Sequence, residues 1–224
     1  MVGYLSKFRF AELCILTNEP DFSDIEVAEY DWSKSIYGDA SKAVPKDAPE
    51  PLGKPVTMTH YQDANLYHDI ITGQSVTAIL HFLNKFPIDW YSKKQATVKT
   101  ATYGSEYIAA RTCVNQIMDL RTTLRYLGVP IRDMSYMFGD NESVVNSSTH
   151  PPSKLHKRHN ALSFHHVHKA IASGYVVLTH LPGKFNPVDI LSKHWGYQII
   201  WPIIKPILFF HGDTADLIQD DDTA

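Results

Sequence analysis

Residues 56–63 read VTMTHYQD, a run rich in β-branched and aromatic residues that ends on an acidic residue, Asp63. A run of this composition is typical of a β-strand. Two further runs follow after short gaps, SVTAILHFLN at 75–84 and FPIDWYSKKQ at 86–95, and each predicts another strand. Three strands joined by short turns predict an antiparallel meander, and this meander decides the fold class.

The rest of the chain alternates between helical and strand patterns. Apolar residues recur on one face of a long helix at Cys113, Ile117, Leu120, Leu124 and Leu127. Gly128 and Pro130 are expected to end this helix. Strands are predicted at 134–140 and 175–181, a short helix from 141, and a helix over 154–173. The order predicts an α/β fold with a mixed sheet and helices on its faces.

A last helix is predicted over residues 186–194, which read NPVDILSKH. Asn186 is the expected N-cap, and Pro187 suits the first helical position.

The overall composition indicates one domain of ordinary size with appendages. The chain has 224 residues, 44% of them hydrophobic, and two cysteines, which are too few for a disulfide framework. We therefore expect an intracellular location, in a cytoplasmic particle or the nucleus. No leader opens the chain and no apolar run reaches spanning length, so no membrane partner is expected. The apolar segment at 199–210 is interrupted by two prolines and a lysine, and predicts a packing segment or a partner surface.

Charge is distributed unevenly along the chain. Residues 1–50 hold ten acids and five bases, residues 211–224 hold five acids and no base, and residues 51–210 hold nine acids and sixteen bases. A basic middle between acidic ends suggests a polyanionic partner such as nucleic acid, although ordinary surface lysine and arginine would give the same balance.

The segment at 39–55 contains four prolines and predicts a linker. Before it, Tyr30, Trp32 and Tyr37 could pack onto a neighbour. We therefore divide the chain into residues 1–50, a domain at 51–198, and a C-terminal extension with an acidic tail at 199–224.

Four of the nine acids in the middle region stand at predicted element ends: Asp63, Glu106, Asp140 and Asp189. Strand ends and helix starts can meet at one rim of an α/β sheet. Four carboxylates there would repel one another unless cations lay between them, and oxygen ligands suit Mg²⁺ or Mn²⁺. Each acid also has a structural alternative. Asp140 could cap the next helix, Asp63 could cap a turn, and the other two could interact with helix dipoles.

Short motifs surround these acids in a fixed order: WYSKKQ at 90–95, SEYIAA at 105–110, GDNESV at 139–144 and DILSK at 189–193. In this order they resemble the ribonuclease H domain of copia-type retrotransposon polyproteins. The resemblance covers roughly residues 56–197.

The resemblance implies a ribonuclease H-like fold, with a five-stranded mixed sheet flanked by helices. It also implies hydrolysis of the RNA strand of RNA–DNA hybrids with two Mg²⁺ or Mn²⁺ ions. Asp63 would bridge both ions, Glu106 and Asp140 would bind the ion near the leaving group, and Asp189 would hold the ion that activates water. Residues 1–50 would then be the remnant of a reverse-transcriptase connection region, with the polymerase part of the same polyprotein as a partner. Candidate nucleic-acid contacts are Lys93, Lys94, Asn141, Ser143, Lys157, Arg158, His159 and Lys193.

The sequence departs from the resembled pattern in three places. Asn65 stands where the pattern has a second, non-essential acid, and Gly104 stands where an acid precedes the catalytic glutamate. The loop before Asp189 has no histidine. His180 lies just before that loop, and we expect it to be a half-buried strand residue.

Five histidines crowd the helix predicted at 154–173: His156, His159, His165, His166 and His168. A zinc site is conceivable but no cysteine or carboxylate completes it, so contact with a nucleic-acid backbone is the preferred interpretation. Lys93 and Lys94 adjoin Trp90 and Tyr91, which suits phosphate contact and stacking, or plain solvent exposure. Arg111, Arg121 and Arg125 are interpreted as surface charge.

Two other functions remain open. The chain could be a decayed or repurposed copy that binds nucleic acid without cutting it. An integrase or transposase would place a glutamate last among three acids, whereas here the glutamate is second of four.

Overall fold

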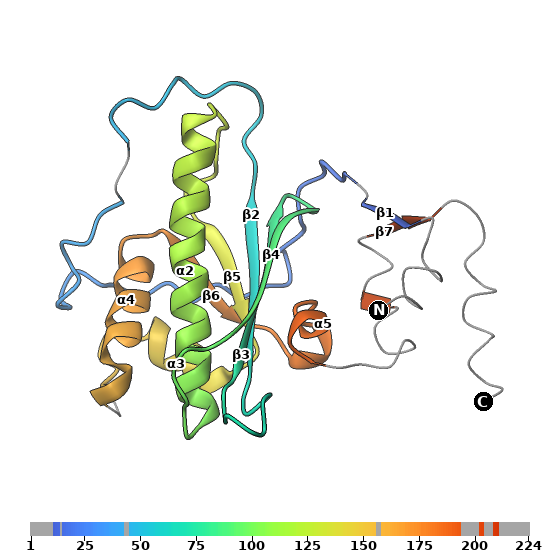
Figure 1. Cartoon of the computed structure of the whole chain (residues 1–224). Helices are drawn as coiled ribbons and strands as arrows, with labels where there is room; N and C mark the ends of the chain where they lie inside the picture. Colours follow the sequence, from blue (N-terminus) through green and yellow to red (C-terminus); the bar gives the residue numbers. More distant parts are fainter. Residues whose placement is uncertain are drawn as a thin grey trace.

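The computed structural model describes residues 11–13, 15–42, 45–155, 158–193, 202–203 and 208–210. Its central sheet consists of β2 (Met58–Asn65), β3 (Val76–Leu83), β4 (Phe86–Lys94), β5 (Ser135–Gly139) and β6 (Val176–His180). The strand order is β4-β3-β2-β5-β6 (Figure 1). The first three strands are antiparallel, and β5 is parallel to both β2 and β6. This mixed sheet confirms the meander and the expected ribonuclease H-like α/β fold.

One face of the sheet is covered by α2 (Thr102–Tyr126), α3 (Glu142–Thr149) and α4 (Ala161–Ala172) (Figure 1). The main core lies between them, where Val114 and Ile117 of α2 pack with Met137 of β5 and Val167 of α4. The helix α2 ends as expected, with Gly128 at a φ of 72° that favours glycine.

The opposite face carries α5 (Asp189–Ser192). Val188, just before it, is fully buried against Ala78, Leu80 and Phe82. Short strands β1 (Ala11–Leu13) and β7 (Leu208–Phe210) pair antiparallel in a separate two-stranded sheet.

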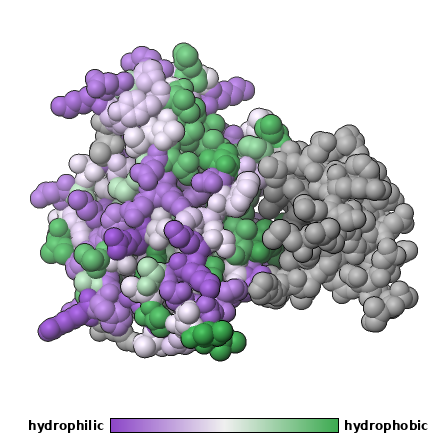
Figure 2. All heavy atoms as spheres, viewed as in Figure 1, coloured by the Kyte–Doolittle hydropathy of each residue, from purple (hydrophilic) through white to green (hydrophobic). Residues whose placement is uncertain are grey.

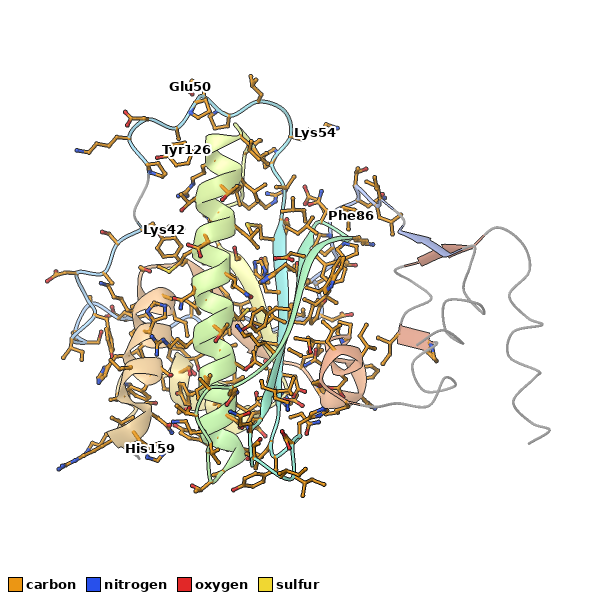
Figure 3. The ribbon with its side chains drawn as sticks, in the orientation of Figure 1. Lys42, Glu50, Lys54, Phe86, Tyr126 and His159 are labelled. Carbon is orange, nitrogen blue, oxygen red and sulfur yellow. The ribbon has the colours of Figure 1, made fainter. Side chains whose placement is uncertain are left out.

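Residues 15–42 run as irregular chain against the domain. The ring of Phe22 lies 4.3 Å from that of Tyr136, and the ring of Trp32 lies 5.5 Å from that of His168 in α4. Residues 45–55 pass the end of α2 near Tyr126, where the Leu52 amide donates to the Gly128 carbonyl at 2.8 Å (Figure 3). The aromatic residues before the linker therefore pack onto the domain itself.

The helix expected at 154–173 is shorter than predicted. It begins at Ala161, after a single 3-10 turn at Arg158–Asn160. Within α4, Phe164 and Val167 are buried in the core, whereas Leu155, before the helix, packs against the core only partly buried. His156, Lys157 and the acidic tail lie outside the described residues.

Two local predictions are wrong. Asn186 is not the cap of α5, because the helix begins at Asp189 with Val188 at the N-cap. Arg121 is not surface charge, because it is fully buried. Its guanidinium donates to the Ser135 hydroxyl at 3.0 Å and to the carbonyls of Arg132 and Asp133, which fixes the chain entering β5. Burial lowers the pKa of Arg121 to about 10.

Among the described helices, none is both long and apolar enough to cross a membrane.

Candidate active site

Asp63 and Asp140 are brought together by the pairing of two parallel strands. Gln62 of β2 is in register with Gly139 of β5, and the two acids follow these residues. A Cβ at Gly139 would lie 2.4 Å from the side-chain amide nitrogen of Gln62, so a larger residue there would require the Gln62 side chain to move. The sheet therefore sets two carboxylates beside each other at one end of neighbouring strands.

Glu106 reaches the same place from α2. It is the fifth residue of the helix, and no acid lies in the first turn, where an interaction with the helix dipole would require it. Its Oε1 accepts from the Ala64 amide at 3.3 Å, next to Asp63. Asp140 is not a cap either, because Asn141 caps α3 through its side chain. Two of the structural alternatives for these acids therefore lose their support.

Asp63, Glu106 and Asp140 each offer an oxygen, and these atoms lie within 4.8 Å of one another. Burial, together with the charges of Asp63 and Asp140, raises the pKa of Glu106 well above its usual range. Burial and the Asp63 charge also raise the pKa of Asp140. The three groups form a partly buried anionic cluster whose repulsion is not fully relieved by the protein.

The fourth acid, Asp189, joins this cluster through a lysine. Lys193 Nζ lies 2.8 Å from Asp189 Oδ1 and 3.7 Å from Asp63 Oδ2. Burial acts to lower the pKa of Lys193, but its hydrogen bond to Asp189 and the nearby carboxylates outweigh this, and the net shift is upward. Burial raises the pKa of Asp189, partly opposed by Lys193. Lys193, predicted as a nucleic-acid contact, thus lies among the acids.

Buried amides hold the acid-bearing segments in place. Asn186 donates to the Gln62 carbonyl at 3.2 Å and so ties the loop before α5 to β2. Gln95 donates to Thr77 at 3.0 Å and to the Ser105 carbonyl at 2.9 Å, which fixes α2 just before Glu106. The sequence analysis missed these positioning roles, because a lone glutamine or asparagine carries no motif.

The cluster suits a divalent cation. Carboxylate oxygens are the ligands that Mg²⁺ and Mn²⁺ prefer. Among the described residues, the buried Oε2 of Glu106 has no hydrogen-bond partner. An unpaired buried oxygen is costly, and a bound cation would relieve it. Asp63, Glu106 and Asp140 are therefore the residues that fit a metal ion.

The described candidate nucleic-acid contacts lie on several elements, and some of them lie near the acids. Lys93 is in register with Thr77, which pairs with Ala64 beside Asp63. Lys94 forms an ion pair with Asp69 at 2.7 Å. Four others are also described: Asn141 caps α3, Ser143 is exposed in α3, and Arg158 and His159 are exposed just before α4, where Figure 3 labels His159.

The histidines of α4 do not form one surface. His168 is fully buried, stacked on Phe164 with ring centroids 4.0 Å apart, so the prediction that it contacts nucleic acid is wrong. His165 is exposed and its Nδ1 lies 2.5 Å from the hydroxyl oxygen of Tyr37. His180 is exposed rather than half-buried, and its Nε2 lies 3.1 Å from the Asp140 carbonyl oxygen.

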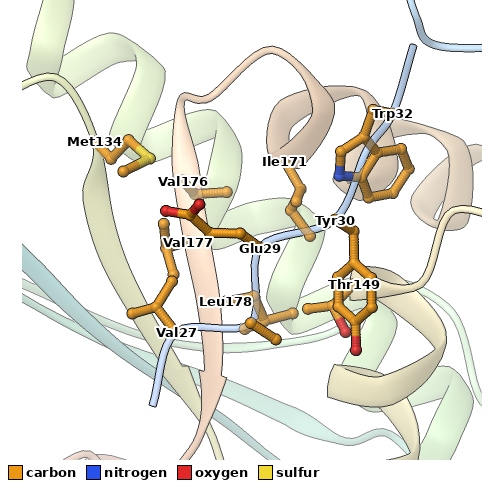
Figure 4. A pocket seen from close by; sticks show the side chains of 11 residues that line it. Val27, Glu29, Tyr30, Trp32, Met134, Thr149, Ile171, Val176, Val177 and Leu178 are labelled. Carbon is orange, nitrogen blue, oxygen red and sulfur yellow. The ribbon is translucent and has the colours of Figure 1, made fainter. Parts of the chain in front are cut away.

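A pocket of about 240 Å³ lies elsewhere, between residues 27–32, β6 and α4 (Figure 4). Its lining is mostly apolar, including Met134, Ile171 and Leu178, with Glu29 at one side. None of the four acids lines it, so it is a packing gap beneath the N-terminal segment and not part of the acid site.

The solved structures to which the chain is similar include two ribonucleases H of low identity. The RNase H1 of Halobacterium salinarum NRC-1 is 13% identical, with a TM-score of 0.47 over 61% of this chain and 94% of that protein. The N-terminal RNase H domain of a Mycobacterium tuberculosis protein is 12% identical, with a TM-score of 0.46 over 67% of this chain and 97% of that one.

Sequence relatives come from plant transposons, while no protein-family model matches the chain. The retrovirus-related Pol polyprotein of transposon RE2 from Arabidopsis thaliana is 23% identical over 141 residues, or 63% of this chain. That of transposon TNT 1-94 from Nicotiana tabacum is 26% identical over 133 residues, or 59%. The chain spans about a tenth of the length of these relatives. The chain is thus similar to the retrovirus-related Pol polyproteins of plant transposons, in agreement with the resemblance to a copia-type ribonuclease H domain that its acidic motifs indicated.

Proposed function

We propose that this chain is a metal-dependent nuclease of the ribonuclease H type that cuts the RNA strand of RNA–DNA hybrids. The observation that carries the proposal is the meeting of Asp63, Glu106 and Asp140 at one end of the sheet, with oxygens within 4.8 Å of one another. The similarity to Pol polyproteins supports the same conclusion, since reverse transcription produces such hybrids.

The proposed metal ligands are Asp63, Glu106, Asp140 and Asp189, with two Mg²⁺ or Mn²⁺ ions. Bound ions of this kind would activate a water molecule and stabilise the leaving oxygen of a phosphodiester. The chain itself holds the carboxylates in a partly buried cluster, where their charge is weakly screened and a bound cation would relieve their repulsion. The positive charge of Lys193 offsets the negative charges of Asp63 and Asp189.

We propose that substrate binding involves the polar and basic residues that the sequence indicated: Lys93, Lys94, Asn141, Ser143, Lys157, Arg158, His159 and Lys193. Lys93 and Arg158 lie on different elements, β4 and the 3-10 turn before α4, which would allow contact with two strands of a duplex. Figure 2 shows that hydrophilic residues cover much of the face seen in Figure 1, with apolar residues between them. We propose the polymerase part of a Pol polyprotein as a partner.

The test is cleavage of an end-labelled RNA–DNA hybrid with Mg²⁺ and then Mn²⁺, beside single-stranded RNA and duplex RNA of the same sequence. We expect cleavage of the hybrid's RNA strand alone, and loss of cleavage in Asp63→Asn. The matched control is Asp119→Asn, an exposed acid of α2, which should cut like the parent. Cleavage that persists in Asp63→Asn would contradict the assignment. Hybrid binding without cleavage by the parent would favour a non-catalytic binding remnant.

A further inference from the structure

The helix α5, which carries Asp189, is too short to be stable alone. It has four residues, and an isolated helix of that length does not form in water. Two of its carbonyl groups are held by side chains from the sheet. The Ser92 hydroxyl donates to the Leu191 carbonyl at 2.7 Å, and the Asn65 amide donates to the Ser192 carbonyl at 2.9 Å. The position of Asp189 therefore depends on side chains of β4 and β2.

Ser192 also acts on Asp63 directly. Its hydroxyl oxygen lies 2.5 Å from Asp63 Oδ2 and 3.4 Å from the Asp189 carbonyl. The hydroxyl has one proton, and the short bond to an ionised oxygen is the stronger one. Ser192 and Asp63 are 2% exposed each, so water does not compete for this bond. A carboxylate accepts about four hydrogen bonds or ligands, so Asp63 keeps capacity for a cation.

Asn65 can hold Ser192 only because it is an amide. A carbonyl oxygen accepts hydrogen bonds and cannot donate one, so the group facing the Ser192 carbonyl must be a donor. The amide nitrogen of Asn65 meets this need, and it also lies 3.1 Å from His68 Nδ1. An ionised aspartate at position 65 would place an acceptor against the carbonyl. The asparagine at position 65, where the resembled pattern has an acid, thus has a physical role in this chain.

We propose that Ser192 and Asn65 are positioning residues of the metal site. Ser192 orients the Asp63 carboxylate, and Asn65 holds Ser192 and with it the turn that carries Asp189. Together they join Asp63 and Asp189, the first and last of the four candidate acids, into one site. This inference rests on the proposed function, because it assigns these residues a purpose in metal binding.

The first test is Mn²⁺ binding by the full chain, measured by isothermal titration calorimetry and by loss of the free Mn²⁺ signal in electron paramagnetic resonance. Loss of a group that orients a metal ligand weakens affinity by about 10–100-fold, and we expect this for Ser192→Ala. Ser192→Thr keeps the hydroxyl and should restore binding to within about threefold of the parent. Ser135→Ala removes another fully buried serine hydroxyl, bonded to Arg121 at 3.0 Å, and is the matched control. It should bind Mn²⁺ like the parent.

Asn65→Asp is a second test, because the proposal and a simple charge effect predict opposite changes in Mn²⁺ affinity. If acids in this region only attracted cations, the added carboxylate would tighten Mn²⁺ binding. The proposed role of Asn65 predicts weaker binding, because the donor to Ser192 is lost. Parent-like affinity in Ser192→Ala, or tighter binding in Asn65→Asp, would overturn the inference and leave the nuclease proposal standing. Absence of Mn²⁺ binding by the parent would overturn both.

Discussion

Replacing Glu106 by glutamine should stabilise the metal-free protein, although it removes a proposed metal ligand. Glu106 is buried, and its oxygens lie near those of Asp63 and Asp140. The glutamine keeps the Oε1 that accepts from the Ala64 amide and adds an NH₂ group that can donate to a neighbouring carboxylate. The change therefore removes repulsion without opening a cavity.

The magnitude follows from the spacing of the oxygens. Two unit charges 4.8 Å apart repel by about 3.5 kcal/mol at an effective dielectric constant of about 20, and Glu106 faces two carboxylates. Lys193 offsets part of this. Protonation of Glu106 sets an upper limit to the destabilisation, because the group can take up a proton instead of staying charged. Keeping Glu106 protonated costs about 1.4 kcal/mol for each pH unit above its usual pKa of 4.5. The repulsion therefore cannot destabilise the folded protein by more than about 5 kcal/mol at pH 8. We expect Glu106→Gln to raise the free energy of unfolding by about 2–4 kcal/mol at pH 8.

The sign of the pH dependence is part of the prediction. The pKa of Glu106 is raised in the folded protein, so the folded state binds this proton more tightly than the unfolded chain does. Stability therefore falls as the pH rises from 4.5 through the raised pKa. Urea unfolding in EDTA from pH 5 to pH 8 should show this decline in the parent and a smaller one in Glu106→Gln. Excess Mg²⁺ should raise the melting temperature of the parent only. Equal stability of the two proteins at pH 8 would refute the clustering of the acids.

Three further predictions concern residues outside the acid cluster. Arg121→Met leaves two carbonyls and a buried hydroxyl without their donor, and should lower the free energy of unfolding by about 2–4 kcal/mol in urea unfolding. Burial lowers the pKa of His168 to about 4, so stability should be lost as the pH falls below 6.5, by up to about 3 kcal/mol. His168→Gln should reduce that loss in unfolding curves at pH 7 and pH 4.5. Phe22→Ala removes a ring packed on Tyr136 and Phe138, and should cost about 1–3 kcal/mol in thermal unfolding, whereas no change would show that residues 15–42 do not stabilise the domain.

The strands and the long helix could be predicted because their patterns are local. The run at 56–63 is rich in β-branched and aromatic residues, and the face from Cys113 to Ile117 has a helical period, so each element can be recognised without its neighbours. Asp63 and Asp140 were predicted at strand ends; Asp140 follows β5 directly, whereas β2 continues past Asp63 to Asn65, so the predicted end of that strand is wrong. Pairing of β2 with β5 then brings them together, as expected for parallel neighbours.

The roles of single polar residues could not be predicted in the same way. Arg121 occurs on a helix among other charges, and only the tertiary fold reveals that it is buried under the chain entering β5. Lys193 and Ser192 stand in one motif, but their contacts with Asp63 depend on where α5 meets the sheet. His168 lies in a histidine-rich stretch, and it is buried among Phe164 of its own helix and Trp32 of the N-terminal segment. Such roles depend on contacts between distant segments, which one sequence does not reveal.

The central claim is that Asp63, Glu106 and Asp140 bind a divalent cation. Crystals of the full chain grown with Mn²⁺ and measured at the manganese absorption edge would test it most directly. The account predicts an anomalous peak in coordination contact with oxygens of all three residues, with Lys193 withdrawn from Asp63. An empty cluster at saturating Mn²⁺, with Lys193 still between Asp63 and Asp189, would contradict the metal site and the nuclease mechanism that depends on it.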